Sequence, residues 1–289
     1  MISRKDAKEI RCKRKLYPIA SFGSLRETFL KTELMKIIIK ENISVLGKTA
    51  GQTAAQMIKA AIEKKDSANI ILATGTSQFE TLNQLVKEDI DWSKVTMFHL
   101  DEYIELPESS PASFRKYLKE RFIEKVSGLK KAYLINGEED AEKECRRLGE
   151  IIKNNIIDVA LVGIGENGHL GFNDPPADFE TDEPFIIVNL DEKCRNQQFG
   201  EGWFKTIDDV PRQAITMSIK QIMKSKKIIC SVPESRKAIA INDCFENAVS
   251  NLFPASVLQK HDECICFLDK DSSALLIKPI VEVSDSFEI

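Results

Sequence analysis

Hydrophobic residues occur along the chain in short continuous runs, separated by longer stretches in which they recur at helical spacing. Most of the runs are apolar at every position rather than at alternate positions, which is typical of parallel strands covered on both faces. The stretches between them, such as residues 54–62 and 79–86, place apolar side chains on one helix face. The runs that predict strands are residues 69–74, 94–100, 158–164, 214–219, 227–232 and 263–268. This alternation predicts an α/β fold with a doubly wound sheet, and the lack of a linker or internal repeat predicts a single domain.

Residues 171–213 depart from this pattern. They contain Pro175, Pro176, Pro184 and Pro211, and their first part, GFNDPPADFETDEPF, is too rich in proline for a helix and too polar for a central strand. Long irregular segments inside compact domains are often functional. We therefore expect a loop or lid here.

The composition excludes several classes of protein. The 289 residues include 41 Lys plus Arg and 45 Asp plus Glu, a net charge of −4, which gives no basic field for nucleic acid and disfavours that partner. No run approaches the roughly 20 apolar residues that a membrane-spanning helix needs, and we expect no membrane partner. The hydrophobic content of 43% and the charged content of 30% are ordinary for a soluble globular protein.

Cysteine and histidine usage bears on compartment and metal binding. The seven cysteines are odd in number and lack a C-x-x-C pair, which predicts reduced thiols in a cytoplasmic protein. Three histidines occur, and none has a Cys or His partner at zinc-finger spacing, so we expect no metal site. The charged N-terminus lacks the apolar stretch of a secretory signal. Residues 1–35 are interpreted as an N-terminal extension of unknown role that precedes a domain over residues 36–289.

The first candidate site is the segment ATGTSQFE, residues 73–80, which follows a predicted strand. Ser77 and Glu80 have the spacing of a capping box, so we expect a helix to begin here. The backbone N–H groups and hydroxyls of such a helix start bind phosphate. An ordinary strand–helix turn with a good cap is the alternative on this segment alone. The residues expected to bind phosphate are Thr74, Gly75, Thr76 and Ser77.

The second candidate site is FHLDEYIEL, residues 98–106, in which Asp101 and Glu102 directly follow a predicted strand. The carboxyl edge of a parallel sheet is where α/β proteins bind ligands, and a partly desolvated carboxylate there can act as a general base. Ser110 and Pro111 then predict a helix start, with the serine as N-cap and the proline at the first helical position. The alternative is a pair of solvated loop acids.

The third candidate site is GIGENGHLGFNDPP, residues 163–176. Its glycines satisfy the G-x-G-x-x-G dinucleotide fingerprint, but that fingerprint has to open a helix, and the residues after it do not look helical. The other interpretation is a glycine-rich turn that approaches a ligand closely and presents a histidine for proton transfer near neutral pH. A histidine whose hydrogen bonds are simply satisfied within the turn is equally open. The polar side chains concerned are His169, Asn167 and Asp174.

The three segments occur together, and in the order found in one enzyme family. ATGTSQ, FHLDEY and GIGENGHLGFNDP resemble the phosphate loop, the base segment and the histidine signature of the glucosamine-6-phosphate deaminases, within the group that includes the 6-phosphogluconolactonases. The similarity continues through LDEKCR and ESRKAIAI. The lactonases usually carry DGHTASLF at the histidine, so NGHLGFND favours the deaminases. The resemblance implies three αβα layers around a mostly parallel, doubly wound sheet.

The resemblance also implies roles for individual residues. Asp101 resembles the general base that moves a proton between C1 and C2 of the sugar, and His169 resembles the group that opens the sugar ring. Asn167 and Asp174 stand where polar residues orient that histidine, and Asp174 is one methylene shorter than the glutamate that is usual there. The cationic pair that holds the sugar phosphate corresponds to Arg195 and Lys237.

The expected activity is conversion of glucosamine 6-phosphate and water to fructose 6-phosphate and ammonia. The expected partner is thus a sugar phosphate, and no metal or organic cofactor is needed. Two alternatives stay open, namely a 6-phosphogluconolactonase in which His169 activates water, and a non-catalytic sugar-phosphate sensor. The presence of both Asp101 and His169 argues against the sensor. Assembly into a homo-oligomer is also left open.

Overall fold

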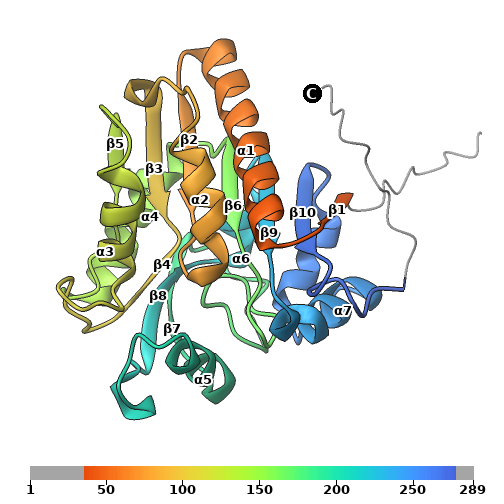
Figure 1. Cartoon of the computed structure of the whole chain (residues 1–289). Helices are drawn as coiled ribbons and strands as arrows, with labels where there is room; N and C mark the ends of the chain where they lie inside the picture. Colours follow the sequence, from red (N-terminus) through yellow and green to blue (C-terminus); the bar gives the residue numbers. More distant parts are fainter. Residues whose placement is uncertain (1–35, 278–289) are drawn as a thin grey trace, which may run out of the picture. The chain divides into compact units, whose positions relative to one another are not determined.

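A sheet of seven strands runs through the described part of the chain, residues 36–277 of this computed structural model (Figure 1). Each pair of neighbouring strands in it is parallel. In spatial order the strands are β1 (Lys36–Lys40), β10 (Cys264–Asp269), β9 (Lys227–Val232), β6 (Val159–Val162), β2 (Ala68–Leu72), β3 (Val95–His99) and β5 (Lys131–Tyr133). Five of the six apolar runs form strands of this sheet, as predicted. The proposed N-terminal extension, residues 1–35, lies outside the described residues.

Helices cover both faces of the sheet and complete three layers (Figure 1). One face carries α1 (Ile43–Lys65), α2 (Phe79–Leu85) and α3 (Phe114–Leu118), and the other carries α4 (Ala141–Lys153), α6 (Ile219–Met223) and α7 (Ala238–Glu246). Successive strand residues point to opposite faces. Ile70 and Leu72 accordingly pack in the core under α1 and α2, whereas Ile71 packs in the core under α4. The three-layer, doubly wound α/β prediction is confirmed.

The longest helix, α1, shows how local sequence fixes one of these layers. Its N-cap is Asn42, whose side chain accepts a hydrogen bond from the Val45 N–H at 3.1 Å. A Cβ atom on Gly47 would lie 2.2 Å from the Cβ of Glu80, so only glycine allows α2 to pack this closely. The predicted apolar face is buried against the sheet, notably at Ala54, Met57 and Ile58.

A second sheet of three antiparallel strands lies beside the carboxyl edge of the first. It consists of β4 (Asp101–Tyr103), β8 (Gln213–Met217) and β7 (Phe185–Asn189), with β8 in the centre. The apolar run 214–219 was expected in the parallel sheet, and that prediction is wrong. The run is buried along its length because β8 is covered on both faces: Ile215 and Met217 join the main core, while Ala214 packs in an aromatic cluster.

The segment 171–213 is only partly the irregular loop that its prolines predict. Residues 171–184 contain neither helix nor strand, but β7 and α5 (Glu192–Gly200) follow them. After the buried Phe185, β7 alternates partly buried and exposed positions, as expected for an edge strand of the small sheet with one face toward solvent. The side chain of Asp191 caps α5 by accepting the Cys194 N–H at 2.6 Å. The second part of this segment therefore contains a regular strand and a regular helix.

Shorter elements complete the described residues. The helix expected at Ser110 and Pro111 instead begins at Phe114, because the side chain of Ser113 takes the N-cap position. No helix among residues 36–277 is long and apolar enough to cross a membrane. The remaining turns are η1 (Thr76–Gln78), η2 (Trp92–Lys94), the π-helical η3 (Lys119–Ile123), η4 (Ile207–Asp209), η5 (Ser235–Lys237) and η6 (Pro254–Lys260).

Candidate active site

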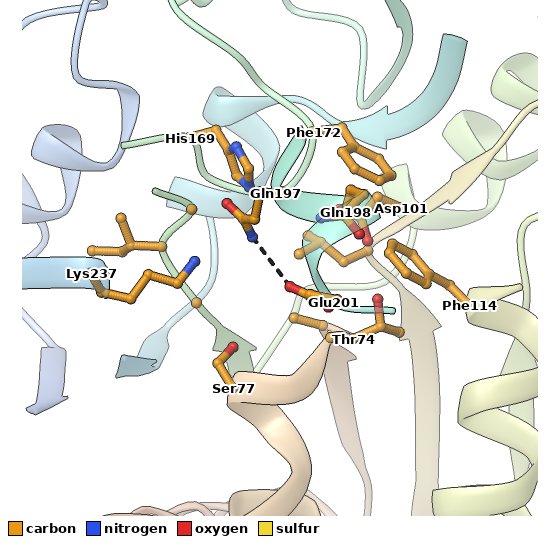
Figure 2. A pocket seen from close by; sticks show the side chains of 17 residues that line it. Thr74, Ser77, Asp101, Phe114, His169, Phe172, Gln197, Gln198, Glu201 and Lys237 are labelled. Atoms are coloured by element: carbon orange, nitrogen blue, oxygen red, sulfur yellow. Dashed lines mark hydrogen bonds between the residues drawn. The ribbon is translucent and has the colours of Figure 1, made fainter. Parts of the chain in front are cut away.

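The carboxyl ends of four adjacent strands, β9, β6, β2 and β3, surround one cavity (Figure 2). The strands β2, β3 and β5 lie on one side of β6, and the later strands β9 and β10 lie on its other side, so the strand order changes direction between β2 and β6. Open α/β sheets bind ligands at such a position. The loops that follow these strands line the cavity, and α5 and the start of α3 contribute from the small-sheet side. All three segments singled out from the sequence are therefore brought together.

The loop after β2 supplies Thr74, Gly75 and Ser77 to the cavity. Gly75 has a φ of +92°, a conformation that favours glycine, and Tyr117 donates a hydrogen bond to its carbonyl at 3.2 Å. The predicted capping box between Ser77 and Glu80 is wrong. Ser77 lies inside the 3₁₀ turn η1 that precedes α2, so its side chain is not at the cap position.

Thr76 belongs to the same loop but does not line the cavity. Its hydroxyl accepts a hydrogen bond from the Arg236 guanidinium at 3.0 Å. The loop is thereby tied to the turn after β9, from which Lys237 enters the cavity.

Asp101 lies where the chain leaves the parallel sheet for the small one. Its carboxyl group lines the cavity and is 5% exposed, and Oδ1 has no hydrogen-bond partner among the described residues. Burial, and secondarily the charge of Glu102, raises the pKa of Asp101 from 3.8 to about 8. A Cβ on Gly171 would lie 3.5 Å from Oδ2, so the glycine-rich loop packs directly on this carboxyl group. Such a buried acid is a candidate general base.

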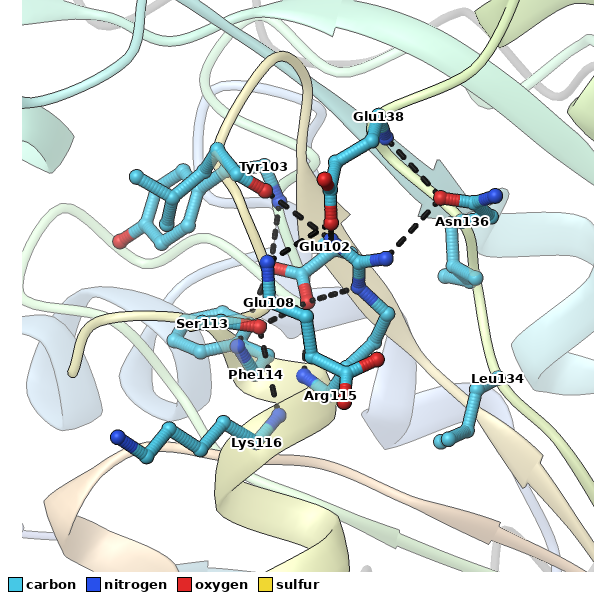
Figure 3. A network of polar contacts seen from close by, with 12 residues as sticks. Glu102, Tyr103, Glu108, Ser113, Phe114, Arg115, Lys116, Leu134, Asn136 and Glu138 are labelled. Atoms are coloured by element: carbon cyan, nitrogen blue, oxygen red, sulfur yellow. Dashed lines mark hydrogen bonds and ion pairs between the residues drawn. The ribbon is translucent and has the colours of Figure 1, made fainter. Parts of the chain in front are cut away.

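Glu102 does not line the cavity, and its carboxylate organises the start of α3 (Figure 3). Its carboxylate is fully buried and accepts hydrogen bonds from the N–H groups of Phe114 and Arg115 at 3.2 and 2.7 Å, and from the Ser113 hydroxyl at 3.1 Å. These bonds hold the Phe114 ring at the cavity wall. The alternative of two solvated loop acids is therefore wrong for both Asp101 and Glu102.

The loop after β6 holds a histidine against a carboxylate. Nδ1 of His169 lies 3.1 Å from Oδ1 of Asp174, although it makes no well-aligned hydrogen bond. Asn167 donates to the same carboxylate at 3.0 Å and accepts the His169 N–H at 3.1 Å, while the Asp191 N–H donates to Oδ2 at 3.0 Å. Burial opposes ionisation of Asp174, but these contacts outweigh it and lower the pKa of the carboxyl group. The shorter aspartate thus reaches the imidazole directly.

The same loop rules out the dinucleotide fingerprint. The residues after Gly163, Gly165 and Gly168 form turns, and the next helix along the chain is α5. Gly165 instead lies against the His169 ring, where any Cβ would come within 2.1 Å of it. Gly165 therefore serves close packing against the histidine, whereas Gly163 packs against Gln78 and Gly168 adopts a φ of +83°.

Of the two cations expected to hold phosphate, the structure brings one to the cavity. Lys237 is 2% exposed, and burial together with the neighbouring Arg236 charge lowers its pKa to about 8. Arg195 does not line the cavity. Its guanidinium is directed to the other side of α5, where it donates to the carbonyls of Ile207 and Val210 at 2.7 and 3.1 Å.

Several cavity residues were not found from the sequence. Phe114 and Phe172 form an apolar wall, with their rings stacked at 5.5 Å between centroids. The buried face of α5 is polar, and residues of this type in a helix are ordinarily solvent-exposed. The residues of α5 and its C-terminal end that line the cavity are Gln197, Gln198 and Glu201.

A possible metal-ligand group occurs in the described part of the chain, and it overlaps this site. The side-chain donor atoms of His169, Asp174 and Cys194 lie within 4.8 Å of one another. Burial raises the pKa of the Cys194 thiol well above its usual value, so this sulfur favours its protonated form. The Asp174 carboxylate of this group also accepts the hydrogen bonds from Asn167 and the Asp191 N–H described above.

The fold and the cavity together define the class of protein: a three-layer α/β protein in which a buried acid and a histidine line one cavity at the carboxyl edge of the sheet. Residues 41–266 match the sequence model of the family described as "Glucosamine-6-phosphate isomerases/6-phosphogluconolactonase". The chain belongs to this family.

Individual relatives place the chain nearer one branch of the family. It is 36% identical over 244 residues to a glucosamine-6-phosphate deaminase of Listeria monocytogenes and 34% identical over 243 residues to one of Lactobacillus delbrueckii subsp. bulgaricus; each match covers 84% of this chain and 100% of the relative. The solved structure of a monomeric glucosamine-6-phosphate deaminase superposes with a TM-score of 0.75 at 32% identity, over 84% of this chain and 100% of that one. A Trypanosoma brucei 6-phosphogluconolactonase, at 16% identity and a TM-score of 0.70 over 84% and 99% of the chains, shares the fold.

Proposed function

We propose that this chain converts glucosamine 6-phosphate and water to fructose 6-phosphate and ammonia, by isomerisation followed by deamination. The observation that carries the proposal is the buried Asp101 carboxyl group, which has a raised pKa and an oxygen without a partner, in the same cavity as His169. The 34–36% identical deaminases that match over their whole length support the choice of substrate.

The phosphate of the substrate is assigned to the end of the cavity formed by Lys237 and the loop after β2. The Lys237 ammonium makes none of the hydrogen bonds or ion pairs found among the described residues, so a bound phosphate would be its partner. The hydroxyls of Thr74 and Ser77, with the N–H of Gly75, are the further donors in this role. Thr76 supports the loop through Arg236. Arg195 is assigned no contact with substrate.

His169 is assigned to ring opening. Because Nδ1 faces Asp174, Nε2 is the nitrogen left to move a proton between the ring oxygen and the C1 hydroxyl. Asn167 accepts the backbone N–H of His169 and donates to Asp174, and the Asp174 carboxylate lies beside Nδ1 of the ring. The two residues thus fix the orientation of the imidazole for this step.

Asp101 is assigned to the transfer of a proton from C2 to C1 of the open chain. Removing the C2 proton forms an enolamine, and returning a proton to C1 leaves an imine at C2. Water then adds to C2, the C–N bond breaks, and ammonia leaves. A carboxyl group whose pKa lies near 8 binds a proton tightly enough to carry it between the two carbons and releases it near neutral pH.

An assay with two substrates tests the proposal. We expect the purified chain to release ammonia from glucosamine 6-phosphate and to leave the hydrolysis rate of 6-phosphogluconolactone at its background value. Asp101→Asn should lower ammonia release by about 10²–10⁴-fold, whereas Glu192→Gln, an exposed carboxylate on α5, should retain it. Lactone hydrolysis without ammonia release would make the chain a lactonase. Binding of the sugar phosphate without turnover would make it a sensor. We further propose that the enzyme acts in the cytoplasm.

A further inference from the structure

The polar face of α5 is largely occupied by bonds to the rest of the protein. Gln197 accepts the N–H of Glu166 at 2.8 Å, and Gln198 accepts the Tyr103 hydroxyl at 2.8 Å. Gln197 also donates to Oε1 of Glu201 at 3.4 Å (Figure 2). These contacts position the Glu201 carboxylate in the cavity and provide a hydrogen-bond donor to only one of its two oxygens.

The second oxygen of Glu201 has no donor. Oε2 is buried and makes no hydrogen bond among the described residues, and the side chain as a whole is 5% exposed. The nearest cation, Arg236, lies 3.8 Å from Oε1, and its guanidinium is already shared with Glu166 and Glu234. A buried carboxylate oxygen without a donor costs free energy unless a ligand supplies one.

Glu201 lies in the same cavity as the Lys237 ammonium. No ion pair joins it to Lys237 in the described part of the chain, although both line this cavity. Figure 2 shows the Glu201 carboxylate between Lys237 on one side and Asp101 on the other. The cavity thus offers an ammonium to the anionic end of a ligand and a carboxylate oxygen to a group that donates hydrogen bonds.

We propose that Glu201 is a specificity-determining residue that accepts a hydrogen bond from the sugar portion of the substrate, through a hydroxyl or the ammonium group. The inference rests on the proposed function, because it takes the ligand to be a sugar phosphate whose phosphate is held at Lys237. Loss of one hydrogen bond to a charged group weakens binding by about 10- to 100-fold.

The test compares Glu201→Gln with Glu192→Gln, a matched change at an exposed position of the same helix. For Glu201→Gln we expect KM for glucosamine 6-phosphate to rise about 10- to 100-fold. The inhibition constant of inorganic phosphate should stay within about two-fold of wild type, because this probe has no sugar. Glu192→Gln should change neither value.

One further measurement separates the outcomes. Calorimetric titration with fructose 6-phosphate tests Glu201 without turnover: weakening equal to that of the aminosugar identifies a hydroxyl as the donor, and no weakening identifies the ammonium. An unchanged KM in Glu201→Gln would overturn the inference. Tighter binding of both phosphate and substrate by this variant would also overturn it, because the only effect of the carboxylate would then be to repel the phosphate. A wild-type enzyme that releases no ammonia contradicts the proposed function instead, and calorimetric binding of glucosamine 6-phosphate and of fructose 6-phosphate to both proteins then still decides the role of Glu201.

Discussion

Burial of the Asp101 carboxyl group should make the stability of the protein depend on pH in a way that an amide abolishes. The folded-state pKa is about 8, whereas the unfolded value is near 3.8. Between these values the folded chain keeps a proton on Asp101 that the unfolded chain releases. The free energy of unfolding therefore decreases as pH rises through this window, and the contribution of this group is most favourable to folding at the acidic end.

The magnitude follows from the width of the window. Each pH unit inside it is worth about 1.4 kcal/mol, so the contribution between pH 5 and 7 is about 3 kcal/mol. Asp101→Asn removes the titration and nearly preserves the shape, and the group is 5% exposed, so solvent screening is small. Relative to wild type, the variant should gain about 1.4 kcal/mol for every pH unit in this range.

Urea unfolding of both proteins at pH 5, 6 and 7 measures this difference. All other titrating groups are shared, so their contributions cancel when the two unfolding free energies are subtracted at each pH. The variant should also lose activity, which would identify Asp101 as a residue retained at a cost in stability. A difference that stays constant from pH 5 to 7 would refute the raised pKa.

Three further outcomes follow from the same site. Lys237→Ala should raise KM for the sugar phosphate by about 10- to 100-fold. In the wild type, the affinity for inorganic phosphate, measured by competitive inhibition, should fall above pH 8 because the Lys237 amine loses its charge. Glu102→Gln removes a charge that raises the pKa of Asp101, so the acidic limb of the kcat/KM profile should move to lower pH; an unmoved limb would mean that the two carboxyl groups are uncoupled. Asp174→Asn should lower kcat by about 10-fold or more by releasing the His169 ring, whereas Asp174→Glu should retain more activity, and equal rates for both would reduce Asp174 to a loop-structuring residue.

The parallel sheet could be predicted because each of its buried strands is apolar on both faces and leaves a continuous run in the sequence. The small sheet could not. β4 has three residues, two of them acidic, and β7 is an edge strand in which only Phe185 is fully buried. The run 214–219 is mostly apolar, as the parallel strands are, and its pairing depends on β4 and β7, which the sequence pattern does not reveal.

The site was predictable where a side chain follows a strand. Asp101 comes two residues after β3 and His169 lies in the glycine-rich loop after β6, and the sheet brings them to one cavity. The direction of the Arg195 side chain could not be predicted, because a residue at its position on α5 can point into the cavity or away from it. Its guanidinium donates hydrogen bonds to carbonyl groups 12 and 15 residues further along the chain, and this pairing leaves no signal in the sequence. Glu201 gave no signal, because a glutamate at a helix end is ordinarily exposed, and only the packing of α5 against the loop after β2 buries it.

The fate of the substrate's C2 hydrogen tests the central claim most directly. Glucosamine 6-phosphate deuterated at C2 is incubated with wild type and with Asp101→Asn, and NMR follows loss of the label to water and its arrival at C1 of fructose 6-phosphate. We expect wild type to remove the label at the rate of ammonia release, and the variant to remove it about 10²–10⁴-fold more slowly while still binding the sugar phosphate. A variant that binds normally and removes the label at the wild-type rate would show that Asp101 does not carry the proton.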